Sequence, residues 1–163
     1  MQTKKCNALI LKSVPFQDHH WIITALSQTE GLISFISKGN FKNHMHTNYN
    51  LCLVELVLVP TKSELFRLIE FKVLNHHLFL RDSFLKIKTA QMMAKVILQT
   101  QLFQKQSAFL FHFLLNCIRW LEEVTDMDTF FGIFLLKVLK HEGALYFLPT
   151  CTICQNSQKR WAI

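Results

Sequence analysis

Short apolar runs separated by turns fill the first half of the chain, and this pattern predicts β-strands. Pro15 follows the first run and Pro60 ends the fourth, while the Thr-Glu-Gly segment 29–31 forms a tight connection between the second and third. Five short strands of this kind favour a small closed barrel, because closure leaves no exposed strand edges. The predicted strands are Cys6–Ser13, Trp21–Ser27, Leu32–Ser37, Leu51–Val59 and Glu64–Leu74.

The last two runs differ in how their charges are placed. Glu55 is the only charged residue of its run, which predicts a strand that is covered on both faces. The final run alternates in part, so that one face is expected to be mainly apolar. We expect this face to hold Leu65, Arg67, Ile69, Phe71 and Val73, and the other face to hold Glu64, Glu70 and Lys72.

After Asp82 the apolar residues recur at helical spacing. A first helix is predicted over Phe84–Phe103. Ser107 can cap a second helix that runs to about Val124, and Asp128 can cap a third that Gly143 ends. The fold class is therefore predicted to be α+β, with a five-stranded barrel over residues 1–80 and an all-α domain over residues 81–163.

The second and third predicted helices are apolar around almost their whole circumference. A helix without a polar face must be covered on every side. Three helices and a barrel wall offer too little cover, so these helices imply more chain, a partner protein or a second copy.

The charge of the chain is positive overall and unevenly distributed. The 18 Lys and Arg residues exceed the 11 Asp and Glu residues, which gives a net charge of +7. Such an excess favours polyanionic partners, either nucleic acid or an anionic membrane surface. No acidic residue lies between Glu30 and Glu55, whereas Lys38, Lys42, His44 and His46 all fall in this window.

The cysteines and the N-terminus indicate a reducing compartment. Five cysteines are an odd number, and the polar residues 1–5 do not resemble a signal peptide. A disulfide framework is therefore not expected. No stretch reaches the ~20 uncharged apolar residues that a membrane span needs, so a cytoplasmic protein with no membrane partner is expected.

Several local motifs occur in one order along the chain. They are ALILKS (8–13) before Pro15-Phe16, EGLIS (30–34) leading to Lys38-Gly39, LVEL (53–56), FLL (134–136) before Gly143, and Cys151-Thr-Ile-Cys154. In this order the chain resembles RecO, a family of bacterial recombination mediators and DNA-repair proteins.

The resemblance implies an N-terminal OB-fold, a helical domain and a zinc site built from two CxxC pairs. It also implies binding of single- and double-stranded DNA, annealing of complementary strands, and association with the nucleoid. RecR and single-stranded-DNA-binding protein are the implied partners, with RecA loaded indirectly.

The chain departs from the family pattern at three places. After Lys38-Gly39, where the family places several cations, this chain has Asn40, Phe41 and Asn43 among the next residues. This difference predicts a weaker affinity for DNA. His20 and Trp21 replace an acidic-basic pair before the second strand. The sequence ends nine residues after Cys154, before a second CxxC, so we expect a shortened or degenerate family member.

Cys151 and Cys154 have the spacing of half a zinc site. Structural zinc needs four ligands, and one CxxC supplies only two. We therefore expect no bound cofactor and a pair of free thiols, with zinc as the alternative.

The candidate DNA-binding residues are cations on predicted barrel strands and turns, together with one aromatic residue. Cations neutralise phosphates, and Phe41 stands in a polar loop where it can stack on a base. Trp21 and Tyr49 are other possible stacking residues, although Trp21 is better explained as core. The candidate cations are Lys12, Lys38, Lys42, Lys62 and Arg67.

No catalytic residues are predicted. The adjacent pairs His19-His20 and His76-His77 cannot chelate one ion easily, because neighbouring strand residues point to opposite faces. No Ser-His-Asp order, glycine-rich phosphate loop or carboxylate pair is present, so an enzyme is not expected.

Two alternatives to DNA binding remain open. In the first, exposed apolar helices make the chain a non-catalytic protein-interaction module, because exposed apolar patches commonly mark interfaces. In the second, the Phe-rich helices attach the chain to a membrane surface, although they lack the separate basic and apolar faces typical of that role.

Overall fold

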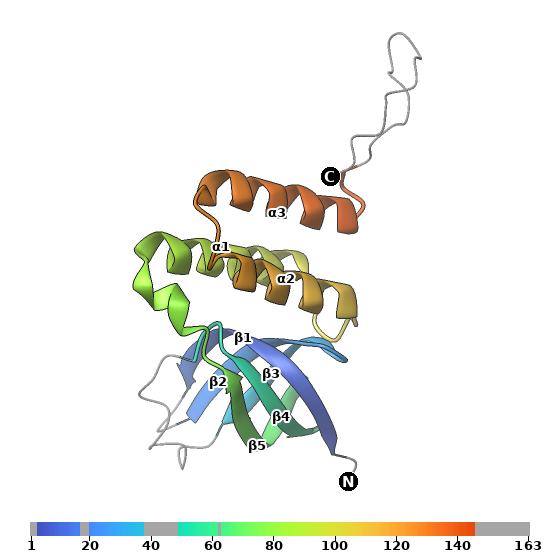
Figure 1. The fold of residues 1–163 in the computed structure, drawn as a ribbon. Coiled ribbons are helices and arrows are strands. Elements are labelled where there is room, and N and C mark those ends of the chain that lie inside the picture. The colour runs from blue at the N-terminus through green and yellow to red at the C-terminus, as the bar shows by residue number, and fades with distance from the viewer. Residues whose placement is uncertain (1–2, 17–19, 38–48, 62, 146–163) are drawn as a thin grey trace. The chain divides into compact units, whose positions relative to one another are not determined.

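A closed five-stranded barrel forms the N-terminal half of the computed structural model, which describes residues 3–16, 20–37, 49–61 and 63–145. Helices α1 and α2 lie together against one side of the barrel (Figure 1). The elements are β1 (Lys4–Phe16), β2 (His20–Ser27), β3 (Gly31–Ser37), β4 (Leu53–Val59), β5 (Leu65–Asn75), the 3₁₀ helix η2 (Leu78–Asp82), α1 (Phe84–Thr100), α2 (Ala108–Trp120) and α3 (Met127–His141). The predicted α+β class, an OB-fold barrel followed by helices, is confirmed.

The order of strands around the barrel is β1-β2-β3-β5-β4. The long strand β1 pairs with β4 through residues 4–9 and with β2 through residues 8–16. A bulge between Ile10 and Lys12 shifts the register of β1, as bulges do where a strand passes from one partner to the next. The sheet closes through β3 and β5, which pair in parallel at Ser34–Ile36 and Leu65–Arg67.

The barrel wall is buried on both sides where the helices cover it. Its interior is filled by apolar side chains from all five strands, and Phe35 is the largest of those that are fully buried. On the outside, Leu9, Leu26 and Leu32 lie in one cross-strand row and are at most 1% exposed. Helices α1 and α2 contact β1, and α2 contacts β2, so these helices cover the outer row.

Two expectations about the last strands were wrong. A register shift between the pairs Val57–Glu70 and Leu58–Leu68 leaves Ile69 as an extra residue, which is 44% exposed. Phe66, Leu68, Phe71 and Val73 therefore face the core, and Leu65, Arg67 and Ile69 do not share their face. The strand β4 alternates between buried and half-buried residues, and Glu55 lies on its outer face in an ion pair with Lys5.

The helix boundaries follow the predicted signals closely. Ser107 caps α2, because its hydroxyl accepts a hydrogen bond from the Leu110 N–H at 3.3 Å. Helix α1 ends at Thr100 rather than Phe103, and α2 ends at Trp120 rather than Val124. Gly143 adopts a φ of +74° just after α3, which is the left-handed conformation that terminates helices. The prediction that Asp128 caps α3 was wrong, because α3 begins at Met127 and Asp128 lies inside its first turn.

The described residues group into two compact units, one within Met1–Met127 and one within Asp128–Ile163. The predicted boundary at residue 80 between a barrel domain and a helical domain stays a prediction. In α3, the rings of Phe131 and Phe134 stack at 6.2 Å. Among the residues that the structure describes, no helix has the length and apolar character to cross a membrane.

The connection between α1 and α2 passes directly over the β2–β3 turn. The Gln104 N–H donates to the carbonyl oxygen of Leu32 at 2.8 Å. Gly31 has a φ of +72°, and a Cβ atom at this position would collide with the carbonyl oxygen of Lys105. Only glycine can adopt this positive φ and leave room for the Lys105 carbonyl oxygen without strain.

We predict that Gly31→Ala lowers the free energy of unfolding by roughly 2–5 kcal/mol, the sum of a left-handed backbone penalty and an overpacked contact. Gly143→Ala is the matched control, because it has the same backbone conformation with open space around it, and roughly 1 kcal/mol is expected there. Urea denaturation followed by circular dichroism measures both. Equal losses would contradict the close packing at Gly31.

Candidate nucleic-acid interface

The outer face of β1, β2, β3 and β5 continues beyond the leucine row as three further cross-strand rows. Residues that pair directly across strands share one face of the sheet, so the register defines the rows. The first row is Lys12, Thr24, Ser34 and Leu65, the second is Val14, Ile22, Ile36 and Arg67, and the third is Phe16 and His20. We call these ten residues the outer rows, and none of them is acidic.

Lys12 and Arg67 supply the cations of the outer rows, and both side chains are exposed. The bulge in β1 turns Lys12 outward, and the parallel β3–β5 pairing brings Arg67 beside Ile36. The two residues are separated by three strand spacings of about 4.8 Å and one two-residue step of about 6.7 Å. The register therefore places them in neighbouring rows on the outside of the barrel, three strands apart and not in contact.

The surface between these cations is polar and then apolar. Thr24 and Ser34 are each only 9% exposed, and their hydroxyl groups hydrogen-bond to one another at 3.0 Å. Val14 is 39% exposed and Phe16 is 40% exposed. A chain of phosphates can thus contact the cations while bases rest on apolar side chains.

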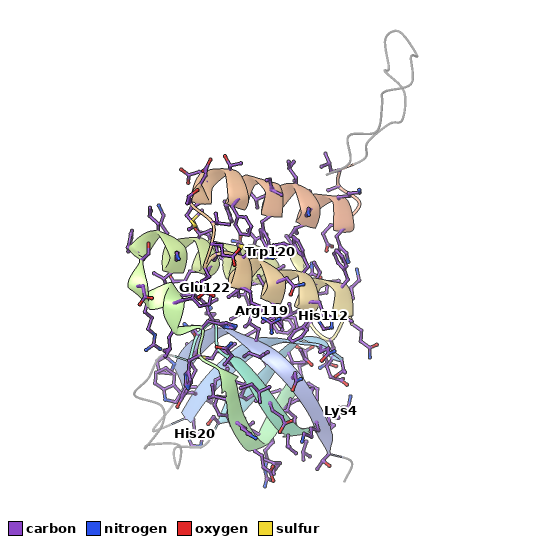
Figure 2. The ribbon with its side chains drawn as sticks, in the orientation of Figure 1. Lys4, His20, His112, Arg119, Trp120 and Glu122 are labelled. Atoms are coloured by element: carbon purple, nitrogen blue, oxygen red, sulfur yellow. The ribbon has the colours of Figure 1, made fainter. Side chains whose placement is uncertain are left out.

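Other cations of the barrel are neutralised by acidic neighbours. Lys4 forms an ion pair with Glu30 at 2.7 Å, and Lys5 forms one with Glu55 at 3.1 Å. Lys72 lies directly across from Glu55 in the β4–β5 ladder. In Figure 2, Lys4 and His20 lie on opposite sides of the barrel, so the ion pair of Lys4 lies away from His20 of the third outer row.

Sequence reasoning missed Phe16, Val14 and His20 as members of this surface. The sequence signal for these residues was an alternation of Lys12, Val14 and Phe16 that continues past Ser13, the predicted end of the first strand. Trp21 packs against the barrel core, as expected, and so does Tyr49, whose ring meets the edge of Phe71 at 5.3 Å.

Several predicted site residues lie outside the described part of the chain. These are Lys38, Phe41, Lys42, Lys62, Cys151 and Cys154. Their assignment to DNA or zinc binding stays a prediction. Ser37, which directly precedes Lys38, pairs with Trp21 at the end of β3.

The part of the sequence that forms the barrel matches a known family. Residues 1–77 match the family described as "Recombination protein O N terminal". Over these residues, slightly less than half of the chain, the sequence is similar to the RecO family. The resemblance drawn from the sequence motifs is confirmed, and the match covers the whole barrel from β1 to the end of β5.

Curated relatives extend the similarity beyond the barrel. The "DNA repair protein RecO" of Chlamydia pneumoniae is 28% identical over 152 residues, covering 91% of this chain and 60% of the relative. The protein of that name from Chlamydia trachomatis serovar L2 is 26% identical, covering 91% and 62%. That of Mesoplasma florum is 27% identical, covering 98% and 61%. The chain therefore spans about three-fifths of the length of these relatives.

The described cysteines have the character of buried apolar residues. Cys6, Cys52 and Cys117 are all buried, and none of them forms a disulfide. Burial raises the pKa of the Cys6 and Cys52 thiols, which disfavours the thiolate that binds metal. Within the described ranges no three His, Cys, Asp or Glu residues gather as a metal site.

We predict that the purified chain carries far less than one equivalent of zinc, because Cys151 and Cys154 supply only two of the four ligands that structural zinc needs. Elemental analysis by mass spectrometry measures the metal content. A Cys151→Ser variant with the same trace zinc content supports this expectation. Stoichiometric zinc that is lost in this variant would overturn it.

Proposed function

We propose that this chain is a non-catalytic DNA-binding protein that acts as a recombination mediator in DNA repair. On this proposal it binds single- and double-stranded DNA and anneals complementary strands. Two findings support the proposal: the RecO match over the barrel and the name "DNA repair protein RecO" carried by the relatives. No residue is assigned a role in bond making or breaking.

The observation that carries the proposal is the charge of the outer rows. Lys12 and Arg67 are exposed and form no ion pair with any described residue. A basic surface without acidic members attracts phosphates and releases the counterions that surround them. Lys4 and Lys5 already have acidic partners, so their contribution to such a surface is smaller.

Annealing follows from the same electrostatics. Two complementary strands repel one another through their phosphates, and a cationic surface that contacts both backbones screens this repulsion. The half-exposed Val14 and Phe16 provide apolar contact for unpaired bases in a manner that tolerates any sequence. Lys38, Lys42, Lys62 and Phe41 belong to the same proposed surface.

The proposed partners follow from the family relationship. We infer contacts with RecR and with single-stranded-DNA-binding protein, and through them an indirect role in loading RecA. The proposed location is the nucleoid, within the cytoplasm. The relatives are longer than this chain, so each of these partners requires a direct binding measurement on this chain.

We predict that binding to a single-stranded oligonucleotide weakens steeply with salt. Each neutralised phosphate contributes roughly 0.7 to the slope of log K against log salt, so five cations in contact give about 3.5. Fluorescence anisotropy over a salt series measures the slope with oligonucleotides of several sequences. Absent binding, or binding that does not respond to salt, would contradict the proposal.

We predict that Lys12→Glu combined with Arg67→Glu lowers the salt slope by about 1.4, since two phosphate contacts are lost. The loss of affinity should be similar for all sequences, because phosphates carry no sequence information. Lys88→Glu combined with Lys95→Glu is the control, because it changes the net charge equally on exposed residues of α1. Equal effects of the two pairs of substitutions would count against DNA binding at the outer rows.

A pure protein-interaction role is the competing function. Exposed apolar residues on α1 and α2, including Phe84 at 77% and Trp120 at 51%, favour this alternative because large exposed patches mark interfaces. The same anisotropy series separates the two functions. Tight self-association by light scattering together with no DNA affinity would favour the interaction role.

A further inference from the structure

Two strained residues are tied together where the barrel meets the helices. Leu51 has a φ of +68° and His77 has a φ of +46°. Left-handed backbone is costly for side chains other than glycine, and for a bulky leucine it is a true outlier. Such strain persists only when surrounding contacts hold it, and the contact that joins these two residues is a single hydrogen bond.

The His77 ring provides this contact from a buried position. Nδ1 lies 2.7 Å from the carbonyl oxygen of Leu51, and because a carbonyl can only accept, Nδ1 carries the proton and donates. The ring is 2% exposed, and its Nε2 atom is buried with no hydrogen-bond partner. The His77 backbone N–H donates to the Asn75 side-chain oxygen at 2.8 Å, which fixes the turn after β5.

The Leu51 side of the bond anchors the segment that leads into β4. The Leu51 N–H donates to the Ile10 carbonyl oxygen at 2.7 Å, and the Ile10 N–H donates to the Cys52 carbonyl oxygen at 3.1 Å. His77 immediately precedes η2, and its carbonyl oxygen accepts from the Leu80 N–H at 3.0 Å. One ring therefore connects the entry of β4, the bulge of β1 and the start of the helical region.

We propose that the His77–Leu51 hydrogen bond is an acid-sensitive latch: protonation of Nε2 opens the segment 49–52 from the barrel–helix junction while the barrel stays folded. A proton on Nε2 places a charge and an unsatisfied donor in a buried site, which is unfavourable. Opening transfers the charged ring to water and relieves the strain at Leu51 and His77.

Taken together, the surroundings of the His77 ring disfavour its charged form. Burial lowers the pKa of His77, the hydrogen bond to Leu51 opposes this shift, and the positive charge of Arg119 on α2 lowers the pKa further. The ring of Phe79 in η2 lies edge-on to the His77 ring, with the ring centroids 6.1 Å apart. His76 is the preceding residue in the chain. Burial raises the pKa of the nearby Cys52 thiol, and the positive charge of Arg81 partly offsets this rise.

The direction of the pH effect follows from this shift. Above the ordinary histidine pKa of about 6.5, the ring is neutral in the open and closed forms, and the latch is stable. Below that pH the open form gains a proton that the closed form does not. The opening equilibrium therefore rises by up to tenfold per pH unit until the lowered pKa of the closed form is reached.

Thiol labelling at Cys52 tests the latch in the full chain. Cys52 is 1% exposed, and its sulfur lies 3.8 Å from His76 Nδ1, whereas the buried Cys6 and Cys117 serve as internal controls. The probe is 4,4′-dithiodipyridine, with labelled peptides separated by mass spectrometry. Each rate is divided by that of the urea-unfolded chain at the same pH, which removes the intrinsic reactivity of the thiol.

We expect the protection of Cys52 to fall by up to tenfold per unit between pH 6.5 and 5, while that of Cys6 and Cys117 stays constant. His77→Asn should remove this pH dependence, because asparagine tolerates a positive φ and can donate but does not titrate. His76→Asn is the matched control and should keep it.

Three outcomes overturn the latch. Constant protection of Cys52 across this range shows that the segment does not open. Simultaneous loss of protection at all three cysteines shows acid unfolding of the whole unit. A pH dependence that His76→Asn removes assigns the effect to the wrong histidine. The profile of the unsubstituted chain tests the first two points even where a variant fails to fold.

Discussion

The structure depends on the double pairing of β1. Its first half closes the barrel against β4, and its second half pairs with β2, so one strand removes the edges that an open sheet would expose. The bulge between Ile10 and Lys12 reconciles the two pairings. It also determines which side chains are exposed, because Leu11 is buried and Lys12 lies on the exposed side.

Local sequence patterns predicted the elements better than their faces. Apolar runs ended by Pro15 and Pro60 located strands, and Ser107 and Gly143 marked helix ends, because these signals act within a few residues. The extra residue at Ile69 and the outward position of Glu55 were not predictable in this way. The first depends on the register with β4 and the second on an ion pair with Lys5, fifty residues earlier in the chain.

The candidate site was predicted only in part for the same reason. Lys12 and Arg67 were chosen because they lay on predicted strands, and the sequence contains no local signal that they lie in neighbouring cross-strand rows. That relation arises from the parallel β3–β5 pairing, which places Arg67 beside Ile36. Phe16 was missed because the first strand is longer than its apolar run, and Pro15 does not end it.

The net charge of +7 is a poor measure of the field that a polyanion meets at this barrel. Interactions between exposed charges are screened over about 8–10 Å at ordinary ionic strength, so only local balance matters. Lys4 and Lys5 form ion pairs with Glu30 and Glu55, whereas Lys12 and Arg67 form no ion pair with any described residue. On our proposal, the local pairing of charges, more than the total charge, decides which face of the barrel attracts DNA.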